Sequence, residues 1–243
     1  RADGTGLTTL VTRCSEASTP PAWRPIPTAN SYWLVYLDAR GSDGACLTSW
    51  PPGYTSPGRN LWAVNVSPGS PVLAGDPVCL TCGLVEQDGD YWDSPAWSRD
   101  GSHLSAFQVK RRTAGSSYAF HVFDVTFDPA GFPVLGHDWL FAPPEFDPPG
   151  TVPSGWAHWS DSFVMRTDDA DGTFGLQRYE LDLGSEPEGI RSSTPLTTGT
   201  RFRFFRPRWS PDDNQLVDAI LGTGSTSTDG IYVVTPGPPF SMK

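Results

Sequence analysis

SPAWSRDGSHLSAFQVK, at residues 94–110, is the stretch of this chain that decides its fold. Its Ser-Arg-Asp-Gly segment at 98–101 is typical of a tight turn, because Asp accepts hydrogen bonds from nearby backbone groups and Gly tolerates a positive φ. After the turn, the run from Leu104 to Val109 alternates between apolar and polar residues, which indicates a half-buried strand. The stretch therefore predicts a strand, a turn and a second strand.

Imperfect copies of this pattern recur along the chain. In PRWSPDDNQLVDAI the next apolar anchor, Leu216, follows Trp209 by seven residues, and Leu104 follows Trp97 by the same number. Two degenerate copies contain Trp159, in the shortened AHWSDSFVMR, and Trp23, in PAWRPIPTANSYWLVYL with a longer loop. The chain thus contains four repeat units, each expected to begin near one of these tryptophans.

Further apolar segments follow each copy. A second strand with an aromatic or aliphatic start is expected at 60–66, 118–125, 174–181 and 230–236. A looser segment then closes three of the units, as in PVLAGDPVCLTC, FPVLGHDWLFA and GIRSSTPLTTG. The 25 Gly and 25 Pro residues fall between apolar runs rather than in one block, which favours many short strands over helices. Four short strands per unit is the pattern of a propeller blade.

The repeat resembles that of TolB-type β-propellers, in which Pro-x-Trp-Ser-Pro-Asp-Gly precedes an apolar strand and then a strand of the Ile-Tyr-Val type. Pro95-Ala96-Trp97-Ser98 and Pro207-Arg208-Trp209-Ser210 carry the resemblance, which extends over about residues 20–236. It implies an all-β propeller of four-stranded antiparallel blades. It says little about chemistry, because propellers serve many functions.

We expect one propeller domain over residues 1–243, with units at about 15–82, 83–142, 143–199 and 200–243. The 34 residues after Trp209 and the 22 before Trp23 add up to 56, about one repeat length. This arithmetic predicts four blades, closed into a ring by an N-terminal strand at 6–14 that joins the last unit. The alternative is a fragment of a larger, six-bladed propeller.

Charge and hydropathy narrow the classes of partner. The net charge of −10 argues against sequence-independent binding of nucleic acid, which requires a basic surface. No apolar run approaches the roughly 20 residues of a membrane span. The start at Arg1-Ala2-Asp3 suits either a mature protein after signal removal or a trimmed chain.

The four cysteines are Cys14, Cys46, Cys79 and Cys82. Four cysteines allow three pairings, and the sequence does not select one outright. We favour Cys14 with Cys46 and Cys79 with Cys82. A redox or zinc role for the Cys-x-x-Cys segment is the alternative, although no second Cys or His pair lies at close spacing. Disulfides in an acidic protein with a secreted-type fold predict a periplasmic, secreted or cell-surface location.

The first strand of a propeller blade lines the central channel, so residues near the repeat tryptophans are candidates for ligand binding. His158, Arg206 and Arg208, together with Trp156, are the candidates here. The forked guanidinium groups suit a carboxylate or phosphate. The alternative is that these side chains pair with acidic turns or face solvent.

A candidate calcium site lies in the loop Thr167-Asp168-Asp169-Ala170-Asp171-Gly172. Asp168, Asp169 and Asp171 would supply the carboxylate oxygens that calcium prefers. The loop is not an EF-hand, because Thr167 occupies the leading position and Arg178 the twelfth. An ordinary Asp-Gly hairpin turn is the alternative. Calcium is the one cofactor that the sequence indicates.

No catalytic constellation is evident, since Gly-x-Ser-x-Gly is absent and the four histidines are scattered. We therefore expect an extracytoplasmic scaffold that presents a face or channel to a protein, peptide or glycan. The alternative is a propeller hydrolase or lyase acting on a polysaccharide, with residues drawn from loops such as 143–162, where Glu145, Asp147 and Asp161 lie among aromatic residues.

Overall fold

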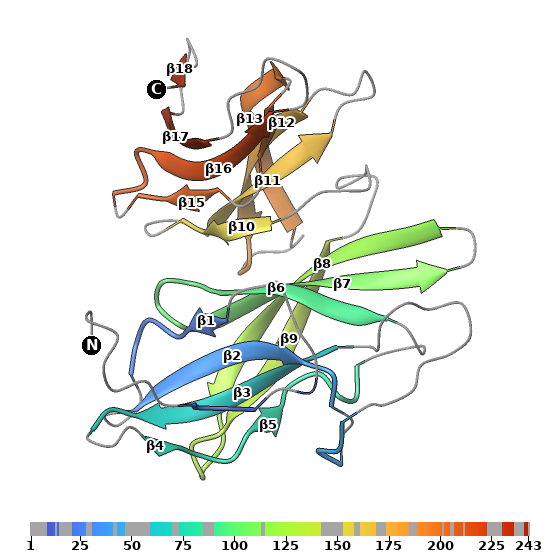
Figure 1. The fold of residues 1–243 in the computed structure, drawn as a ribbon, viewed down its shortest axis with the longest axis vertical. Coiled ribbons are helices and arrows are strands. Elements are labelled where there is room, and N and C mark those ends of the chain that lie inside the picture. The colour runs from blue at the N-terminus through green and yellow to red at the C-terminus, as the bar shows by residue number, and fades with distance from the viewer. Residues whose placement is uncertain are drawn as a thin grey trace.

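The structure is a computed structural model of the chain, and its strands form four separate antiparallel sheets (Figure 1). It describes residues 9–12, 14, 21–27, 31–40, 43–46, 59–69, 73–84, 90–112, 115–141, 153–157, 161–168, 174–184, 189–200, 202–204, 207–210, 212–222, 230–235 and 241–242. None of these residues is helical, so the prediction of an all-β fold is confirmed.

Each sheet is built from one continuous part of the chain. The first contains β1 (Ala22–Trp23), β2 (Tyr32–Asp38), β3 (Asn60–Ser67), β4 (Leu73–Ala74) and β5 (Val78–Cys79). The second contains β6 (Tyr91–Trp97), β7 (His103–Arg112), β8 (Gly115–Phe127) and β9 (Pro133–Phe141).

The two C-terminal sheets follow the same order. The third contains β10 (Pro153–Trp156), β11 (Ser162–Asp168), β12 (Phe174–Asp182) and β13 (Gly189–Thr200). The fourth contains β14 (Phe202–Phe204), β15 (Arg208–Trp209), β16 (Leu216–Gly222), β17 (Gly230–Thr235) and β18 (Ser241–Met242). Each sheet falls within one of the four expected repeat units, except that β13 ends one residue beyond its unit.

A tryptophan occupies the same register position in every sheet. Trp97 pairs with Leu104 and Trp209 with Leu216, each seven residues further on. In the third sheet the pairing residue is Trp156, opposite Phe163 at the same spacing. The identification of Trp159 as the third repeat tryptophan is therefore wrong. In the first sheet Trp23 lies opposite Leu34, as expected from its longer loop.

The backbone after these tryptophans is also repeated. The amide after the tryptophan donates to the carbonyl at the start of the next strand, from Ser98 to His103 at 2.9 Å and from Ser210 to Gln215 at 2.8 Å. Ala157 donates to Ser162 at 2.8 Å in the same way. This common geometry supports the equivalence of Trp97, Trp156 and Trp209, which we call the repeat tryptophans together with Trp23.

Apolar interfaces join consecutive sheets, and each has a repeat tryptophan in its core. Trp97 packs with Trp33, Leu61 and Phe123 between the first and second sheets. Trp156 packs with Phe120 between the second and third. The third interface contains Trp209 and residues of the third sheet, among them Val164, Leu176 and Leu196. Burying large aromatic rings at every interface is a major source of stability for sheets whose described strands do not pair with one another.

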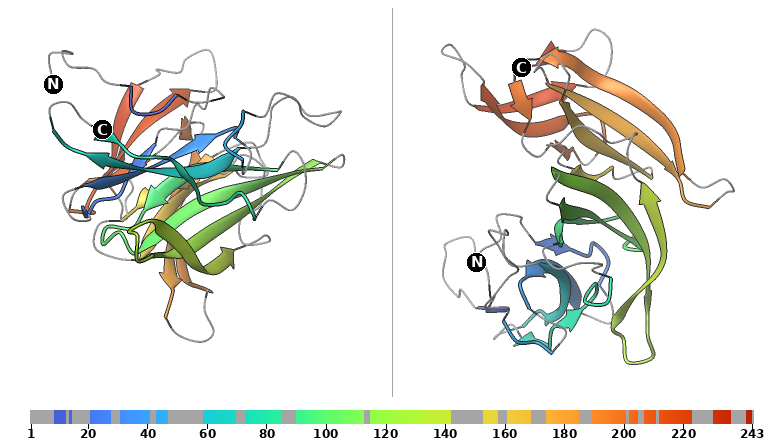
Figure 2. Two further views of the ribbon diagram at one scale, coloured as in Figure 1. Left: turned by 90° about the horizontal axis from the view of Figure 1, so that it is seen from below. Right: turned by 90° about the vertical axis from the view of Figure 1, so that its right-hand side faces the viewer.

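The sheets follow one another along an open arc, with the first and fourth sheets at its two ends (Figure 2). Their first strands lie next to each other in series, β1 beside β6, β6 beside β10 and β10 beside β15. In the fourth sheet β14 and β15 both pair with β16, so together they occupy the first-strand position. No sheet in the described part of the chain closes into a barrel, and the four sheets do not complete a propeller ring there.

The described part of the N-terminal segment, residues 9–12 and 14, lies against the first sheet. Leu10 and Val11 pack on the outer face of β2 and β3, and the backbone N–H of Cys14 donates to Asp38 at 2.8 Å. Residues 9–12 and 14 form no strand, and β18 already supplies an outer strand to the fourth sheet. The expected strand pairing of residues 6–14 with the last unit is therefore wrong for the part that is described. Leu10 and Val11 are instead partly buried on the sheet nearest in sequence.

Arg24 joins the first sheet to the turn after Trp97. Its Nε donates to the carbonyl of Gly101 at 3.0 Å, and its guanidinium lies 4.8 Å from the centre of the Phe127 ring. Gly101 has a φ of +65°, and a Cβ there would lie 2.8 Å from Arg24 Nε. The turn thus requires glycine for its backbone conformation and for the close approach of Arg24.

We expect Gly101→Ala to be more destabilising than Gly131→Ala. Both glycines have positive φ, which costs a non-glycine residue about 1–3 kcal/mol, but nothing lies within 4 Å of a Cβ on Gly131. The extra cost at Gly101 is about 1 kcal/mol, because Arg24 loses its hydrogen bond there. Denaturant unfolding of both variants measures this difference, and equal losses would show that Arg24 does not stabilise the interface.

Candidate functional site

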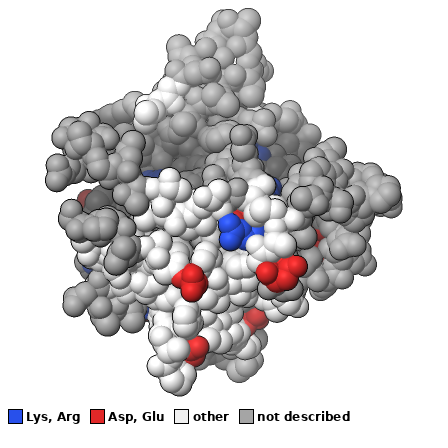
Figure 3. All heavy atoms as spheres, turned by 60° about the horizontal axis from the view of Figure 1, so that its bottom comes forward, with Lys and Arg blue, Asp and Glu red and all other residues white. Residues whose placement is uncertain are grey.

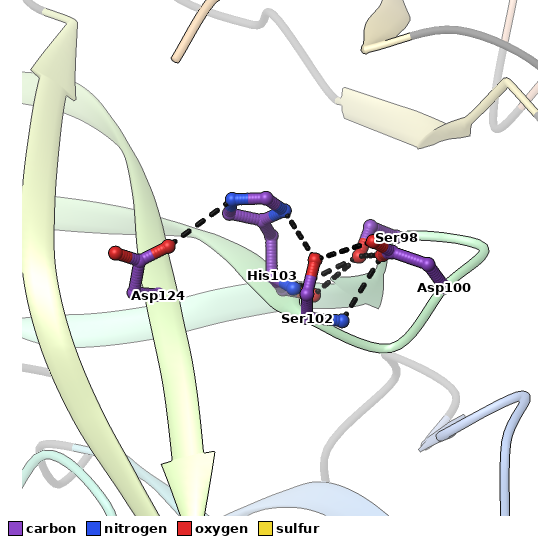
Figure 4. A network of polar contacts seen from close by, with 5 residues as sticks. All are labelled: Ser98, Asp100, Ser102, His103 and Asp124. Carbon is purple, nitrogen blue, oxygen red and sulfur yellow. Dashed lines mark hydrogen bonds and ion pairs between the residues drawn. The ribbon is translucent and has the colours of Figure 1, made fainter. Parts of the chain in front are cut away.

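The most extensive described network of polar side chains lies on the turn between β6 and β7 (Figure 4). The hydroxyl of Ser98 donates to Asp100 Oδ1 at 2.7 Å and accepts from the backbone N–H of His103 at 2.9 Å. Ser102 donates to Asp100 twice, from its N–H at 3.0 Å and from its hydroxyl at 2.7 Å. Asp100 is thus the acceptor that organises the turn.

The pKa of the Asp100 carboxyl lies below its ordinary value. Burial alone would raise this pKa, but the hydrogen bonds from Ser102 and Ser98 and the nearby His103 together outweigh it. The carboxylate form is the one that accepts these hydrogen bonds, so the turn keeps Asp100 ionised at neutral pH.

His103 connects this turn to the interface between the second and third sheets. Its Nδ1 lies 2.8 Å from Ser102 Oγ and its Nε2 lies 3.1 Å from Asp124 Oδ1 on β8. The ring stacks on Trp156 of the third sheet, with centroids 6.2 Å apart and planes at 25°. Trp139 of β9 lies against it at 5.7 Å. The imidazole is therefore fixed on both nitrogens and lies against two indole rings.

Ser102, His103 and Asp124 have the side-chain types of a nucleophilic triad, but their geometry does not suit that chemistry. A nucleophilic hydroxyl donates its proton to the imidazole, whereas the Ser102 hydroxyl donates to Asp100. The Asp124 carboxylate instead fixes the imidazole within the second sheet, and the imidazole ring stacks on Trp156 of the third. The network is thus best explained as a structural joint.

The fourth sheet repeats the turn with different residues. Ser210 Oγ donates to Asp212 Oδ1 at 2.5 Å and accepts from the N–H of Gln215 at 3.0 Å. The side chain of Asn214 takes the role of the Ser102 hydroxyl and donates to Asp212 at 2.9 Å. Asp213 has a φ of 56° where the second sheet has Gly101 at 65°. Recurrence of the network in a second unit indicates that it belongs to the repeat.

The hydrogen bond from the Ser210 hydroxyl, followed by those from Asn214, lowers the pKa of Asp212 to about 2. Since the pKa in the folded state is depressed, the stabilisation is present above the ordinary carboxyl pKa of 3.8 and is lost as pH falls towards 2. We expect Ser210→Ala to raise the pKa of Asp212, as measured by NMR titration of its carboxyl carbon. An unchanged titration midpoint would show that the Ser210 hydrogen bond is not formed in solution.

A second His–Asp pair lies in the second sheet, on the side facing the first. His121 Nδ1 lies 2.9 Å from Asp138 Oδ2, and the buried ring contacts Trp92 edge-on with centroids 4.8 Å apart. This agrees with the expectation that a histidine on a strand has a structural role. The pairing with Asp138, 17 residues away, had no signal in the sequence.

Of the four ligand-binding candidates, the structure describes Trp156 and Arg208, which lie on the neighbouring strands β10 and β15. Arg208 lies exposed on β15, the short first strand of the fourth sheet. Trp156 is only 7 % exposed, and its indole N–H donates to Ser105 Oγ at 2.9 Å, so its ring is part of an interface rather than of a channel. His158 and Arg206 lie outside the described residues. The spacing of seven from Trp156 to Phe163 was the signal that identifies this tryptophan as a repeat position.

Of the three calcium candidates, the structure describes Asp168 alone. Asp168 ends β11, where it pairs with Phe174 across the hairpin, while Asp169 and Asp171 lie outside the described residues. The described residues contain no group of three or more His, Cys, Asp or Glu side chains that could hold a metal ion. The alternative of a hairpin turn agrees with the pairing of β11 and β12 on either side of the loop.

Two disulfides connect the cysteines in the pairs that the sequence analysis favoured. Cys14 is bonded to Cys46, and Cys79 to Cys82. Two such bonds indicate an oxidising environment outside the cytoplasm. Among the residues that the structure describes, no helix has the length and apolar character to cross a membrane.

We compared the chain with protein-family models, with curated proteins and with solved structures, and none of them matches it.

Proposed function

We propose that this chain is an extracytoplasmic binding scaffold of the propeller type, similar to TolB-type repeats, in which the four sheets act as four blades. The observation that carries the proposal is the arrangement of the first strands. β1, β6, β10 and β15 lie side by side in series, so the sheets present one edge of each unit towards a common surface. Propeller-type proteins use this surface to bind partners.

The described polar groups favour binding over catalysis. The carboxylates of Asp100 and Asp212 are used by their own turns, and His103 is fixed between Ser102 and Asp124. Arg208 is exposed on a first strand, where its guanidinium group suits a carboxylate. The ligand that fits best is a protein, peptide or glycan with an acidic group. The two disulfides support a location outside the cytoplasm.

The bend in β6 adds a feature to this surface. The register of β6 against β7 shifts between Asp93 and Ala96, and Ser94 has a φ of 51°. The Asp93 side chain accepts the Ser94 N–H at 2.7 Å, which stabilises the bulge. Bulges of this kind are common at binding sites because they redirect side chains. We include Asp93 and Ser94 in the proposed binding surface.

On the face shown in Figure 3, the described acidic side chains form small separate spots, and basic atoms near the centre lie beside acidic atoms. Together with the net charge of −10, this favours a ligand recognised by a few specific contacts rather than by a general electrostatic field. The net charge also argues against nucleic acid as a partner.

Glycan and peptide arrays probed with the purified chain test the proposal. We expect Arg208→Ala to weaken binding of an acidic ligand about 10-fold or more, as for a residue that makes a charged contact. Arg191→Ala is the matched control, because Arg191 is exposed on β13 and pairs with Asp182 at 3.0 Å. Equal binding by wild type and Arg208→Ala would exclude the first-strand surface.

The alternative function is hydrolysis or elimination on a polysaccharide. It predicts the release of new chain ends from an acidic polysaccharide, with loss of turnover in the His158→Ala and Arg208→Ala variants. Binding without release of chain ends would exclude this alternative for the polysaccharide tested.

A further inference from the structure

Each internal interface is formed by the same two register positions. One is the repeat tryptophan of the later sheet, and the other lies on the third strand of the earlier sheet. The second position is occupied by Leu61, Phe120 and Leu176 in the first three sheets. In each sheet this residue pairs with a residue on the second strand, which comes three places after the residue opposite the repeat tryptophan. Trp97 is in one apolar cluster with Leu61, Trp156 with Phe120 and Trp209 with Leu176.

These positions are buried wherever a neighbouring sheet is present. The three tryptophans at the interfaces are each 7 % exposed, and Leu61, Phe120 and Leu176 are at most 1 % exposed. At the two ends of the arc the same positions are uncovered. Trp23 is 49 % exposed, and Ile231, which pairs with Ala219 at the second position of the fourth sheet, is 80 % exposed. The chain therefore carries both halves of one more interface of the same kind.

The neighbourhoods of the two positions extend these apolar surfaces. Val217 lies on the same face of the fourth sheet as Ile231 and is 41 % exposed. Tyr32, on the same face of the first sheet as Trp23, is 38 % exposed. On the same face, Leu10 and Val11 pack against a buried cluster that contains Tyr36, Trp62 and Val64. Each end of the arc thus carries a pair of exposed apolar side chains, Trp23 with Tyr32 and Ile231 with Val217.

A planar side chain of the preceding sheet lies on each tryptophan at an interface. Arg24 lies 6.0 Å from the ring of Trp97, His103 6.2 Å from Trp156 and Arg178 5.7 Å from Trp209. Among the described residues, no aromatic, imidazole or guanidinium group lies on the ring of Trp23. Trp23 thus lacks both the apolar neighbouring sheet and the planar side chain that cover the other three repeat tryptophans.

We propose that a second copy of this chain covers these surfaces, with Trp23 of each copy packed on Ile231 and Val217 of the other. The internal interfaces are the template, because the contact continues a packing that the chain already uses three times. The first and fourth sheets lie at opposite ends of the open arc (Figure 2), so a single chain in this conformation does not join them. Two head-to-tail contacts close two arcs into one ring, which satisfies both surfaces in both copies.

Sedimentation velocity of the full chain at about 0.15 M salt tests the proposal, since salt at this level screens the repulsion between two chains of net charge −10. The expected species has twice the mass of the 26.4 kDa chain. Ile231→Arg should weaken this association about 10-fold or more, because it places a charge at the centre of the contact. Leu140→Arg is the control, since Leu140 is 54 % exposed on β9, away from both ends.

Cross-linking identifies the contact itself, because all four native cysteines are paired. A mixture of Trp23→Cys and Ile231→Cys chains should form a disulfide-linked species of two chains under mild oxidation. A wild-type chain that stays at the mass of one copy overturns the proposal. So does equal weakening by Ile231→Arg and Leu140→Arg, or a cross-link that forms only within a chain carrying both cysteines. Ligand binding by the first-strand surface is measured separately and does not depend on these outcomes.

Discussion

Trp156→Ala is expected to lower the free energy of unfolding by about 3–5 kcal/mol. The side chain is buried between the second and third sheets, against Phe120 and the ring of His103. Alanine would leave a large cavity in the contact that joins the two halves of the chain. Since a domain of this size is stabilised by only about 5–15 kcal/mol in total, the variant loses a large fraction of its stability.

Trp23→Ala is the matched control for this prediction. Trp23 occupies the equivalent position in the first sheet but is about half exposed, so its removal should cost only about 1–2 kcal/mol. Denaturant unfolding at a protein concentration low enough to keep the chains separate measures both variants. Equal losses would contradict the assignment of Trp156 as the residue that anchors an interface.

The hydrogen bond of Trp156 contributes part of this effect. Its indole N–H donates to Ser105 Oγ, and both groups are buried between the sheets. Ser105→Ala removes the acceptor and leaves the donor without a partner, which costs about 1–3 kcal/mol. In a double-mutant cycle with Trp156→Phe, the cost of Ser105→Ala should largely disappear. An unchanged cost would show that Ser105 stabilises the fold by other contacts.

The repeat made the local structure predictable, because each unit contains its own turn and strands. The spacing of seven between Trp97 and Leu104 reports a short hairpin, and the same spacing from Trp156 to Phe163 would have placed the third unit correctly. The choice of Trp159 followed the Trp-Ser pair rather than the spacing. The register of a hairpin depends on the number of residues between its strands, so spacing was the better guide.

Contacts between units could not be predicted in this way. His103 and Trp156 are 53 residues apart, and nothing in either segment indicates that their rings stack. The number of repeat lengths likewise suggested a closed ring, but residue counts carry no information about the angle between successive sheets. The position of Leu10 and Val11 depended on the same unknown geometry, because an apolar segment near the N-terminus can cover either end of the arc.

Replacing Cys14 and Cys46 together by alanine is expected to lower the free energy of unfolding by about 4 kcal/mol in the chain-entropy description. The same change at Cys79 and Cys82 should cost only about 2 kcal/mol. The difference arises from the sequence separations of 32 and 3 residues, because a longer loop loses more conformational freedom in the unfolded chain when it is closed. Denaturant unfolding of the two double variants measures both costs.

The first disulfide also holds a covering segment in place, so its loss should have a structural consequence that the second does not share. Without the bond, the segment is held by the hydrogen bond from the Cys14 N–H to Asp38, by that from Arg40 to the carbonyl of Thr12, and by the contacts of Leu10 and Val11. We expect increased binding of a hydrophobic dye to the Cys14→Ala/Cys46→Ala variant under native conditions, because the outer face of the first sheet becomes accessible. Equal stability losses in the two double variants would contradict the dependence on loop length. Unchanged dye binding would instead show that these noncovalent contacts alone fix the segment. In that case the disulfide would act only on the unfolded chain.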